Sequence, residues 1–489
     1  MAFAITQTCC SDASCVTVCP VNCIHPTPDE PDFGTTDMLY VDPRTCIDCG
    51  ACADACPVDA IFPVDALTEP LKSYADVNAD FYADRPLAPA DPSPNFHPWG
   101  PPTFDRVIPS DLAPLDVAVV GTGPAGMYAV QDLLLHTNAN VTLIVRLPVA
   151  GGLVRFGVAP DHPSTKRIGE VFARFHTHPR LRLKLGVEVG GDVTVGELAR
   201  RHDAVIYAVG AATARDLGVP GEDLTGSVAA TTVVGWYNGH PDVPPDAVDL
   251  SAARVVVVGT GNVAMDVARL LTADPATLDG TSIAPHALAA LTSSKVREVV
   301  LLGRRGPEDA AYTRPELLAL TGQDAVEVVA DAHDPRIGAA IDTGAGKAGL
   351  LREVRRETVD WSAPPPHGRR RIVLRFHSAP RAVIGDSQVR GLRVGGDVEI
   401  TTGQVVRAVG YRGTPLPGLP FDNATGTIPN AEGRVRPGTY VVGWVKRGST
   451  GGIGTNKSCA AETIAALLDD AAAGLLTQKT QRRRLFGRH

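Results

Sequence analysis

Residues 116–126 read Asp116-Val-Ala-Val-Val-Gly-Thr-Gly-Pro-Ala-Gly126. A short apolar run ends in a Gly-x-Gly-x-x-Gly turn, and the chain from Gly126 to Leu135 continues with helical character. Such a turn lets the backbone approach a pyrophosphate and places it at the start of the following helix. Val141 to Val145 supplies the next apolar strand. This stretch therefore predicts the first strand-turn-helix-strand unit of a parallel, nucleotide-binding sheet.

The same unit occurs a second time. The apolar run from Arg254 to Val258 leads into a second turn, a helical stretch continues to Leu271, and Val296 to Leu302 forms the next strand. The turn residues expected to bind a second nucleotide are Gly259, Thr260, Gly261, Asn262, Val263 and Ala264. Alanine is an accepted third residue of this pattern. Two nucleotide-binding units are therefore expected.

In each of the two units, the residues that follow the second strand indicate which nucleotide the unit binds. Arg304 and Arg305 stand where an NAD-binding protein carries a carboxylate. Because arginine forms paired, charge-assisted bonds with phosphate, they favour the 2'-phosphate of NADP. The alternative is a solvated arginine pair. In the first strand-turn-helix unit, Val145 stands at the position where the acidic residue is expected. Either water and backbone hold the ribose, or Arg146 alters the local geometry.

Cysteine is concentrated at the start of the chain. Nine of the ten cysteines lie within the first 56 residues, and the other is Cys459. The run Cys46-x2-Cys49-x2-Cys52-x3-Cys56-Pro57 has a partner at a constant offset of 37 residues. In that partner, the aligned residues are Cys9, Asp12, Cys15, Cys19 and Pro20. Thiolates at this spacing wrap an iron-sulfur cluster, and in paired runs the fourth cysteine of each binds the other cluster.

The repeat predicts two clusters. The second cysteine site consists of Cys19, Cys46, Cys49 and Cys52. The first cysteine site consists of Cys9, Cys15 and Cys56, and its fourth ligand is Asp12 by register, Cys10 by proximity, or absent, which gives a [3Fe-4S] centre. Zinc is the alternative metal for sets of four thiolates, but zinc sites rarely use such a dense, duplicated run followed by proline. Cys23 is expected to be a small buried residue near a cluster.

Length and charge limit the class of protein. The chain has 489 residues, enough for about three domains at roughly 150 residues each. Its formal net charge of -8 is mild and of the wrong sign for a nucleic-acid-binding surface. No window is apolar enough for a membrane span, and the first residues lack the pattern of a secretory signal. We expect a soluble, cytoplasmic protein with no nucleic-acid partner.

Changes in amino-acid composition and pattern along the chain predict five segments. Proline recurs from residue 62 to residue 114, which favours an extended linker. The segments are a small cysteine-rich domain (1–62), this linker (63–113), the first part of a nucleotide-binding domain (114–212), a second such domain inserted into it (213–401), and the remaining part with a basic tail (402–489). The tail, from Arg482 to His489, is expected to be solvated, with binding of an acidic partner as the alternative.

Five motifs, in order along the chain, resemble those of the adrenodoxin reductase family. They are Gly152-Leu-Val-Arg-Phe-Gly-Val-Ala-Pro-Asp-His162, Gly235-Trp-Tyr-Asn-Gly239, Gly261-Asn-Val-Ala264, Gly303-Arg-Arg-Gly-Pro307, and Gly443-Trp-Val-Lys-Arg-Gly448 with Gly454-Thr-Asn-Lys457. Members of this family are NADPH-ferredoxin oxidoreductases that contain FAD. With the cysteine-rich segment in front, the chain resembles the actinobacterial ferredoxin/ferredoxin-NADP reductase fusions.

The resemblance implies an α/β fold with two Rossmann-like domains, the NADP domain inserted in the FAD domain, behind a small α+β bacterial-type dicluster ferredoxin domain. It implies an FAD site at Gly121, Gly123, Ala125, Gly126, Val145, Leu153, Val189, Trp444, Gly451, Gly452 and Ile453. It implies an NADP site at Gly259 to Ala264, Arg304, Arg305, Glu316 and Gly451. Two positions depart from the family: its ribose-binding Glu falls at Val145, and a second carboxylate after Glu316 falls at Ala319.

The expected function is electron transfer from NADPH through FAD and the clusters to a ferredoxin or a cytochrome-type acceptor. Asp161 and His162 are candidates for shaping the flavin edge; the alternative is a helix-start aspartate and a packed histidine. A competing hypothesis is a non-catalytic electron-input subunit that docks onto a larger enzyme, similar to the small subunit of glutamate synthase.

Overall fold

The computed structural model describes residues 2–86, 112–323, 325–344 and 346–476. They divide into two compact units. The first unit holds the chain up to Arg155, Ser164–Thr213 and the chain from Arg412 on; the second holds Phe156–Pro163 and Ala214–Tyr411. The expected linker residues 87–111 and the basic tail 482–489 lie outside the described residues. Within the described residues, no helix has the length and apolar character needed to cross a membrane.

The cysteine-rich part of the first unit is a small α+β module, which we call the cysteine module (residues 2–86). Strand β1 pairs with β4 and β2 pairs with β3, both antiparallel. Its elements are β1 (Phe3–Ile5), α1 (Ser14–Val18), β2 (Ile24–His25), β3 (Tyr40–Val41), α2 (Ala51–Ala55), β4 (Ile61–Pro63), two short 3-10 turns and α3 (Ser73–Phe81).

The internal repeat inferred from cysteine spacing is present in the backbone. Helices α1 and α2 begin and end at positions 37 residues apart. The left-handed residues follow the same offset, as Ser11 with Asp48, Ala13 with Gly50 and Asn22 with Asp59. The sulfur atoms of Cys19 and Cys56 each accept a hydrogen bond from the backbone N–H four residues later, at 3.4 and 3.2 Å. The two runs are therefore two copies of one local structure.

Residues 63–86 differ from the expected linker. The sequence between Pro70 and Pro86 has no proline, and it forms helix α3 with Tyr74 and Val77 buried. Asn78, also buried, joins α3 to two strands: its amide Nδ2 donates to the Ile5 carbonyl at 2.8 Å, and its Oδ1 accepts from the backbone N–H groups of Ile5 and Val41. This stretch is thus part of the cysteine module.

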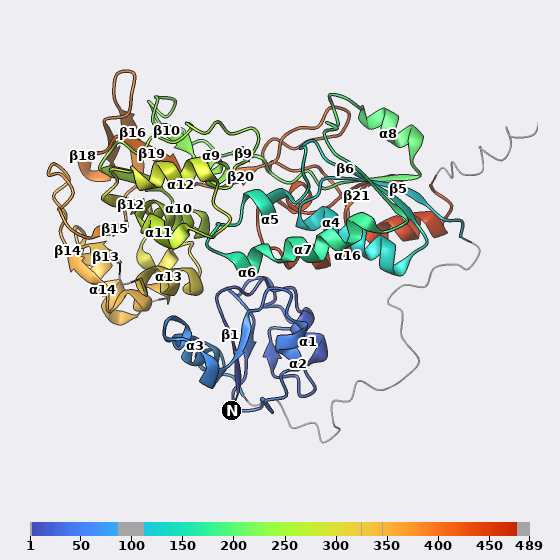
Figure 1. The fold of residues 1–489 in the computed structure, drawn as a ribbon, viewed down its shortest axis with the longest axis horizontal. Coiled ribbons are helices and arrows are strands. Elements are labelled where there is room, and N and C mark those ends of the chain that lie inside the picture. Colours follow the sequence, from blue (N-terminus) through green and yellow to red (C-terminus); the bar gives the residue numbers. More distant parts are fainter. Residues whose placement is uncertain (1, 87–111, 324, 345, 477–489) are drawn as a thin grey trace, which may run out of the picture. The chain divides into compact units, whose positions relative to one another are not determined.

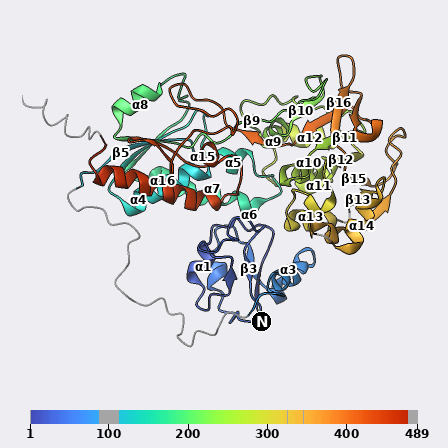
Figure 2. The same cartoon turned by 180° about the vertical axis from the view of Figure 1, so that it is seen from behind.

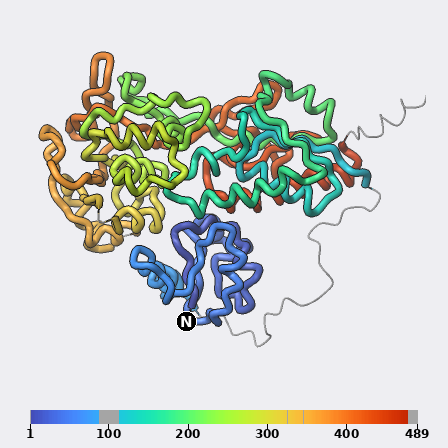
Figure 3. The backbone as a smooth tube through the Cα atoms, in the orientation of Figure 1, coloured from blue at the N-terminus to red at the C-terminus, as the bar shows by residue number. Residues whose placement is uncertain are grey.

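The rest of the first unit is built on a six-stranded sheet with the order β21-β22-β8-β5-β6-β7. The strands from β22 to β7 are parallel, and β21 is antiparallel to β22. They are β5 (Asp116–Val120), β6 (Asn140–Ile144), β7 (Leu181–Lys184), β8 (Ala204–Tyr207), β21 (Arg434–Arg436) and β22 (Thr439–Val441). Strand β22 pairs with β8 at one side of this sheet, so two stretches distant in sequence share one sheet, and Figure 3 traces both through the same unit.

Two long helices of this unit pack against each other. Helix α4 (Pro124–His136) follows β5, and α16 (Thr455–Ala472) lies beside it in both views (Figure 1 and Figure 2). The remaining helices are α5 (Gly152–Phe156), α6 (Pro163–Lys166), α7 (Ile168–Ala173), α8 (Val195–Arg201) and α15 (Trp444–Arg447). The short strands β9 (Thr213–Ala214) and β20 (Tyr411–Arg412) lie where the chain leaves and re-enters this unit.

The second unit has a seven-stranded parallel sheet with the order β10-β19-β11-β12-β15-β13-β14. These strands are β10 (Ser227–Ala229), β11 (Arg254–Val258), β12 (Glu298–Leu302), β13 (Val326–Asp331), β14 (Arg355–Glu357), β15 (Arg370–Arg375) and β19 (Gln404–Arg407). Its helices are α9 (Ala230–Tyr237), α10 (Asn262–Thr272), α11 (Pro275–Leu278), α12 (Pro285–Thr292), α13 (Arg314–Thr321) and α14 (Pro335–Thr343). An antiparallel sheet adds β16 (Pro380–Ile384), β17 (Gly391–Val394) and β18 (Val398–Thr401).

The boundary expected between residues 401 and 402 lies later in the structure. Strand β19 enters the sheet of the second unit between β10 and β11, so the chain stays in that unit until Tyr411. Both strand-turn-helix units predicted from sequence are confirmed, as β5-α4-β6 and β11-α10-β12. The α/β class with two Rossmann-like sheets is likewise confirmed.

We expect Asn78→Ala to destabilise the cysteine module by at least about 2 kcal/mol, because it leaves buried backbone groups of β1 and β3 without partners. The exposed Asp76→Ala on the same helix is the matched control. Urea unfolding, followed through the visible absorbance of the holoprotein, measures the change. Equal midpoints for both variants would contradict a structural role for α3.

Candidate functional site

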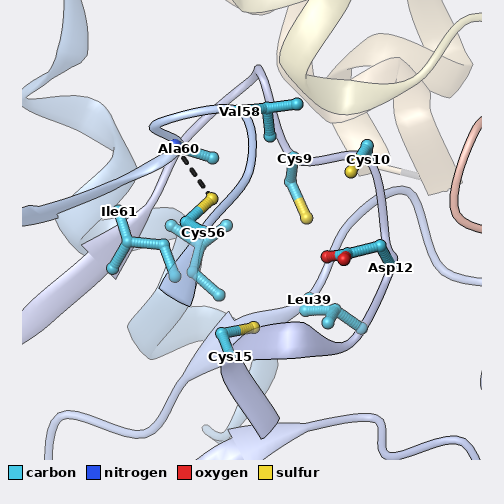
Figure 4. A pocket seen from close by; sticks show the side chains of 10 residues that line it. Cys9, Cys10, Asp12, Cys15, Leu39, Cys56, Val58, Ala60 and Ile61 are labelled. Carbon is cyan, nitrogen blue, oxygen red and sulfur yellow. Dashed lines mark hydrogen bonds between the residues drawn. The ribbon is translucent and has the colours of Figure 1, made fainter. Parts of the chain in front are cut away.

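The first cysteine site forms a pocket in the cysteine module. Figure 4 shows the sulfur atoms of Cys9, Cys15 and Cys56 and the carboxylate of Asp12 turned toward one space. Cys10 also lines this pocket, and the rest of its wall is apolar, from Ile5, Leu39, Val58, Ala60 and Ile61. The structure thus brings together the three predicted thiols and both candidates for the fourth ligand.

The thiols of this pocket are costly to ionise without a positive charge among them. Burial raises the pKa of Cys9, Cys15 and Cys56 above the usual thiol value, and neighbouring thiolates or Asp12 raise them further. Burial also raises the pKa of Cys10 well above that value. Several buried groups that repel one another as anions, in an apolar wall, fit a bound cationic metal centre.

Asp12 is held by its own loop. Its carboxylate accepts hydrogen bonds from the hydroxyl and the backbone N–H of Ser14 at the start of α1. Such a contact is common for an aspartate near a helix start, and here it also keeps the carboxylate turned toward the pocket (Figure 4). A carboxylate is a harder ligand than a thiolate and suits iron-sulfur iron less well.

The second cysteine site is less enclosed. Cys19 and Cys52 are buried, Cys46 is half-buried and Cys49 is exposed. Burial raises the pKa of Cys52 to about 11, and nearby Cys19, Cys46 and Cys49 raise it as well. Cys23 is buried as expected, with its sulfur 3.4 Å from that of Cys19. A hydrogen bond from the Cys23 thiol lowers the pKa of Cys19 to about 6, which favours the thiolate needed for iron.

In the first unit, the two glycines at the start of the turn 121–126 have very different surroundings. A Cβ atom on Gly121 would come within 2.3 Å of the Ala208 carbonyl oxygen, so only glycine fits there. A Cβ atom on Gly123 would meet nothing within 4 Å. The N-terminus of α4 is therefore open to an anionic group such as a pyrophosphate.

Side chains fix the segment 451–453, which lies just before α16 and belongs to the residues implied to bind FAD. The indole Nε1 of Trp444 donates to the carbonyls of Thr450 and Gly451 at 3.0 and 3.3 Å. The amide of the buried Asn456 donates to the carbonyls of Gly452 and Ile453 at 2.9 and 3.2 Å. The segment 451–453 is thus held from both sides by side chains.

Arg447 supplies unmatched donors in the same region. Its Nη2 donates to the Asn456 amide oxygen at 3.1 Å, whereas its buried Nε and Nη1 have no hydrogen-bond partner among the described residues. A phosphate or a ribose hydroxyl would satisfy such donors. Together with the open turn at Gly123, these residues fit a dinucleotide of the FAD type.

The remaining residues of the predicted FAD site differ in their exposure to solvent. Ala125 and Val189 are buried, and Leu153 is 42% exposed. Val145 follows β6, and its backbone N–H and C=O bond to the Lys184 carbonyl and the Val187 N–H. The backbone at Val145 is therefore fixed, and its side chain is apolar where the family carries a carboxylate.

The second unit repeats the turn geometry. A Cβ atom on Gly259 would come within 2.3 Å of the Ala408 carbonyl oxygen, while on Gly261 the nearest atom would be 4.0 Å away. Arg304 and Arg305 are exposed and follow β12, which lies next to β11 in parallel. The predicted arginine pair therefore lies at the same edge of the sheet as the second turn. Asn262 accepts a bond from the Thr313 N–H at 2.9 Å and so ties this turn to α13.

Asp161, His162 and Glu316 meet around an arginine that sequence reasoning missed. The guanidinium of the buried Arg269 donates to both carboxylate oxygens of Asp161 at 2.7 and 3.0 Å. It also reaches His162 Nε2 at 2.8 Å, Asp266 at 2.7 Å and Glu316 at 3.4 Å. His162, Asp266 and Glu316 lie close enough together to suit a metal ion, but Arg269 already supplies positive charge to all three.

Arg269 affects the surrounding carboxyl groups differently. Although burial raises the pKa of Asp161, the bond from Arg269 outweighs it, so that pKa lies below the usual value. Burial, together with the charge of Asp266, raises the pKa of Glu316 to about 8 in spite of Arg269. Glu316 is therefore harder to ionise than an exposed glutamate. Arg269 carries no recognisable motif and could be found only from the fold.

Comparison with known proteins agrees with these features. A model of the pyridine nucleotide-disulphide oxidoreductase family matches residues 115–280, and one of the 4Fe-4S binding domain matches residues 39–62. The second match covers the run from Cys46 to Cys56.

Relatives match over longer ranges. A probable ferredoxin/ferredoxin-NADP reductase of Mycobacterium tuberculosis is 47% identical over 496 residues, which cover 98% of this chain and 85% of that protein. The mitochondrial NADPH:adrenodoxin oxidoreductase of Arabidopsis thaliana is 36% identical over 74% of this chain and 83% of that protein. The structure of Mycobacterium tuberculosis FprA in complex with NADPH aligns with a TM-score of 0.68 and 42% identity, covering 75% of this chain and 87% of that one.

Removing the guanidinium groups of Arg304 and Arg305 tests the second turn. Because a charge-assisted hydrogen bond contributes about 1.5–3 kcal/mol, the Arg304→Ala/Arg305→Ala variant should bind NADPH at least about tenfold more weakly. Affinity for NADH, which has no 2'-phosphate, should stay near that of the unchanged chain. Titration of each nucleotide against the protein measures both.

Arg297→Ala is the matched control, because Arg297 is exposed just before β12, at its opposite end. Equal weakening of NADPH and NADH binding in the double variant would contradict the 2'-phosphate assignment, as would a similar loss in the control.

Proposed function

The chain belongs to the ferredoxin-NADP reductase family, and from this premise we propose that it transfers electrons between NADPH and a one-electron protein acceptor, a ferredoxin or a cytochrome-type protein. One observation carries the proposal: a single chain combines two dinucleotide turns with a pocket into which Cys9, Cys15 and Cys56 converge. Two nucleotide sites suffice for hydride transfer between cofactors. A thiolate pocket adds a place for a one-electron carrier.

Bound FAD would supply two-electron exchange with NADPH and one-electron release, and bound iron-sulfur clusters would supply one-electron transfer. The reaction balances as NADPH plus two oxidised acceptors giving NADP, one proton and two reduced acceptors. The protein's own part is to bind, orient and separate these groups. No residue needs to form a covalent intermediate.

Different residues of the chain bind different parts of the two nucleotides. The open N-termini of α4 and α10 receive the pyrophosphates of FAD and NADP, and Arg447 offers its unmatched donors to FAD. Trp444 and Asn456 hold the segment from Gly451 to Ile453 in place for the flavin. Arg304 and Arg305 bind the 2'-phosphate of NADP.

Arg269 is a positioning residue in this proposal. By bonding Asp161 and His162 at once it fixes both side chains, which are the candidates for shaping the flavin edge. It also reaches Glu316, assigned by the family resemblance to NADP. Because a guanidinium can only donate, His162 Nε2 is the acceptor of this bond.

We further propose two clusters. The second cysteine site, Cys19 with Cys46, Cys49 and Cys52, holds a [4Fe-4S] cluster. The first site, Cys9, Cys15 and Cys56, holds either a [3Fe-4S] cluster or a [4Fe-4S] cluster completed by Asp12 or Cys10. A docking subunit similar to that of glutamate synthase is not proposed, because relatives that match nearly the whole chain are named reductases.

Removing the cysteine module tests the division of labour. A chain without residues 1–105 should stay yellow and reduce ferricyanide with NADPH, because both nucleotide sites remain. Its reduction of a cytochrome should fall sharply, since the one-electron outlet is gone, and a separate ferredoxin should partly restore it. If the shortened chain reduces the cytochrome as fast as the full chain, the clusters are not on the electron path.

Asp12→Cys tests the fourth ligand of the first cysteine site. Because thiolate binds this iron more strongly than carboxylate does, the unchanged protein should lose iron in air and show a [3Fe-4S] EPR signal. The variant should keep about eight irons per chain, the content of two cubane clusters. Asp54→Cys places a thiol on the exposed face of α2 and is the control. An unchanged protein that already keeps all its iron in air would contradict a labile first site.

A further inference from the structure

We propose that the first cysteine site is seated against the FAD-binding part of the first unit by a built docking surface, and that the second site is left for the external acceptor. The docking surface consists of Gly454 and Lys457 at the start of α16, Arg167 before α7, and Tyr128 on α4. Its occupant is the pair of loops that carry the first cysteine site, residues 9–14 and 56–59 of the same chain. All these residues lie in the first unit.

Gly454 makes the closest approach. Its backbone N–H donates to the Cys10 carbonyl at 2.8 Å. Its φ of -65° and ψ of -36° are ordinary helical values, so its backbone conformation does not require glycine. A Cβ atom there, however, would lie 2.3 Å from the Cys10 carbonyl oxygen and from the Ser11 carbonyl. Glycine is therefore needed at this position only because the cysteine loop packs against it.

Lys457 lies one helical turn further along α16. Its ammonium group donates to the Asp12 carbonyl oxygen and to the Ser14 hydroxyl, each at 3.3 Å, and lies 4.0 Å from the Asp12 carboxylate. A lysine thus gathers three oxygens of the loop between Cys9 and Cys15. Because Gly454 directly follows the segment 451–453, this contact continues the loop proposed to hold the flavin.

Arg167 secures the other loop. Its guanidinium forms an ion pair with Asp59, which comes three residues after Cys56. The basic partners belong to the FAD-binding part and the acidic partners to the cysteine module, at Arg167 with Asp59 and at Lys457 with Asp12. Such complementary charge fixes the register of two surfaces. Both loops of the first cysteine site are therefore held, each by its own cation.

Tyr128 on α4 is near enough to the first cysteine site to be affected by the charges of Cys10 and Asp12. It is 6% exposed, its ring meets that of Phe172 edge-on at 5.0 Å, and its hydroxyl has no hydrogen-bond partner among the described residues. Burial raises the pKa of this phenol, and the nearby Cys10 and Asp12 raise it further. A buried, unmatched donor close to the first cysteine site suits a hydrogen bond to a cluster sulfur, and such bonds tune cluster potential.

The second cysteine site has a different surface. Cys49 is exposed, and beside it Ile47 is 57% exposed. An exposed apolar side chain next to a cluster ligand suits transient contact with another electron carrier. The first site is thus the input side of the module and the second site is the output side. This order rests on the proposed function, whereas the docking itself does not.

Hydrogen exchange on the full-length holoprotein tests the docking without turnover. In the unchanged chain, residues 453–458 and 9–14 should exchange slowly. Arg167→Asp and Asp59→Arg should each increase exchange in both segments about two- to fivefold, the range expected for one exposed ion pair. The swapped pair Arg167→Asp/Asp59→Arg should restore protection. Lys184→Glu, an exposed charge change on β7, is the control and should have no effect.

Gly454→Ala tests the close approach. The added methyl group should release both segments to a greater extent than either charge variant, because it meets backbone that cannot move aside. The ratio of NADPH-cytochrome activity to NADPH-ferricyanide activity should fall. Gly196→Ala, on the exposed face of α8, is the matched control.

The outcomes separate this proposal from the proposed function. Equal exchange in the unchanged chain, the charge variants and Gly454→Ala would overturn the docking surface, and so would failure of the swapped pair to restore protection. Protection that responds as expected supports the docking, even if the shortened chain without residues 1–105 shows that the clusters are off the electron path. In that case only the assignment of input and output sides is overturned.

Discussion

In both units, the first glycine of the nucleotide turn lies so close to the neighbouring strand that no side chain fits. The positions for a Cβ atom on Gly121 and on Gly259 are each 2.3 Å from a carbonyl oxygen, of Ala208 and Ala408 respectively. Each alanine begins an Ala-Val-Gly turn directly after a strand, β8 or β19. This approach brings the turn down onto the sheet and leaves the N-terminus of the next helix open. The nucleotide sites, and hence the chemistry proposed for the chain, depend on it.

Features written in short, local patterns could be predicted from the sequence. The β5-α4-β6 and β11-α10-β12 units follow from apolar runs that end in glycine turns, because the strand, the turn and the start of the helix are contiguous. The duplicated cysteine runs are local in the same sense, and their offset of 37 residues recurs in α1 and α2. The thiols of Cys9, Cys15 and Cys56 meet as the spacing predicted.

Features that depend on residues distant in sequence could not be predicted. Helix α3 lies within a proline-rich stretch that predicted an extended linker. Asn78 holds this helix by hydrogen bonds to backbone groups of β1 and β3, which are more than thirty residues away in sequence. Strand β19 belongs to the second unit because it inserts between β10 and β11. Arg269 looks like any helical arginine until the fold brings Asp161, 108 residues away, to its guanidinium. In each case long-range packing, rather than local pattern, decides the outcome.

In the proposed function, electrons from NADPH pass through the iron-sulfur sites of this chain on their way to the acceptor. Rapid-freeze EPR of the full-length holoprotein, mixed anaerobically with NADPH and a cytochrome, tests it most directly. We expect the iron-sulfur signals to change at least as fast as the cytochrome is reduced, and to return when NADPH is exhausted. Signals that stay in their resting form while the cytochrome is reduced at the full rate would contradict it.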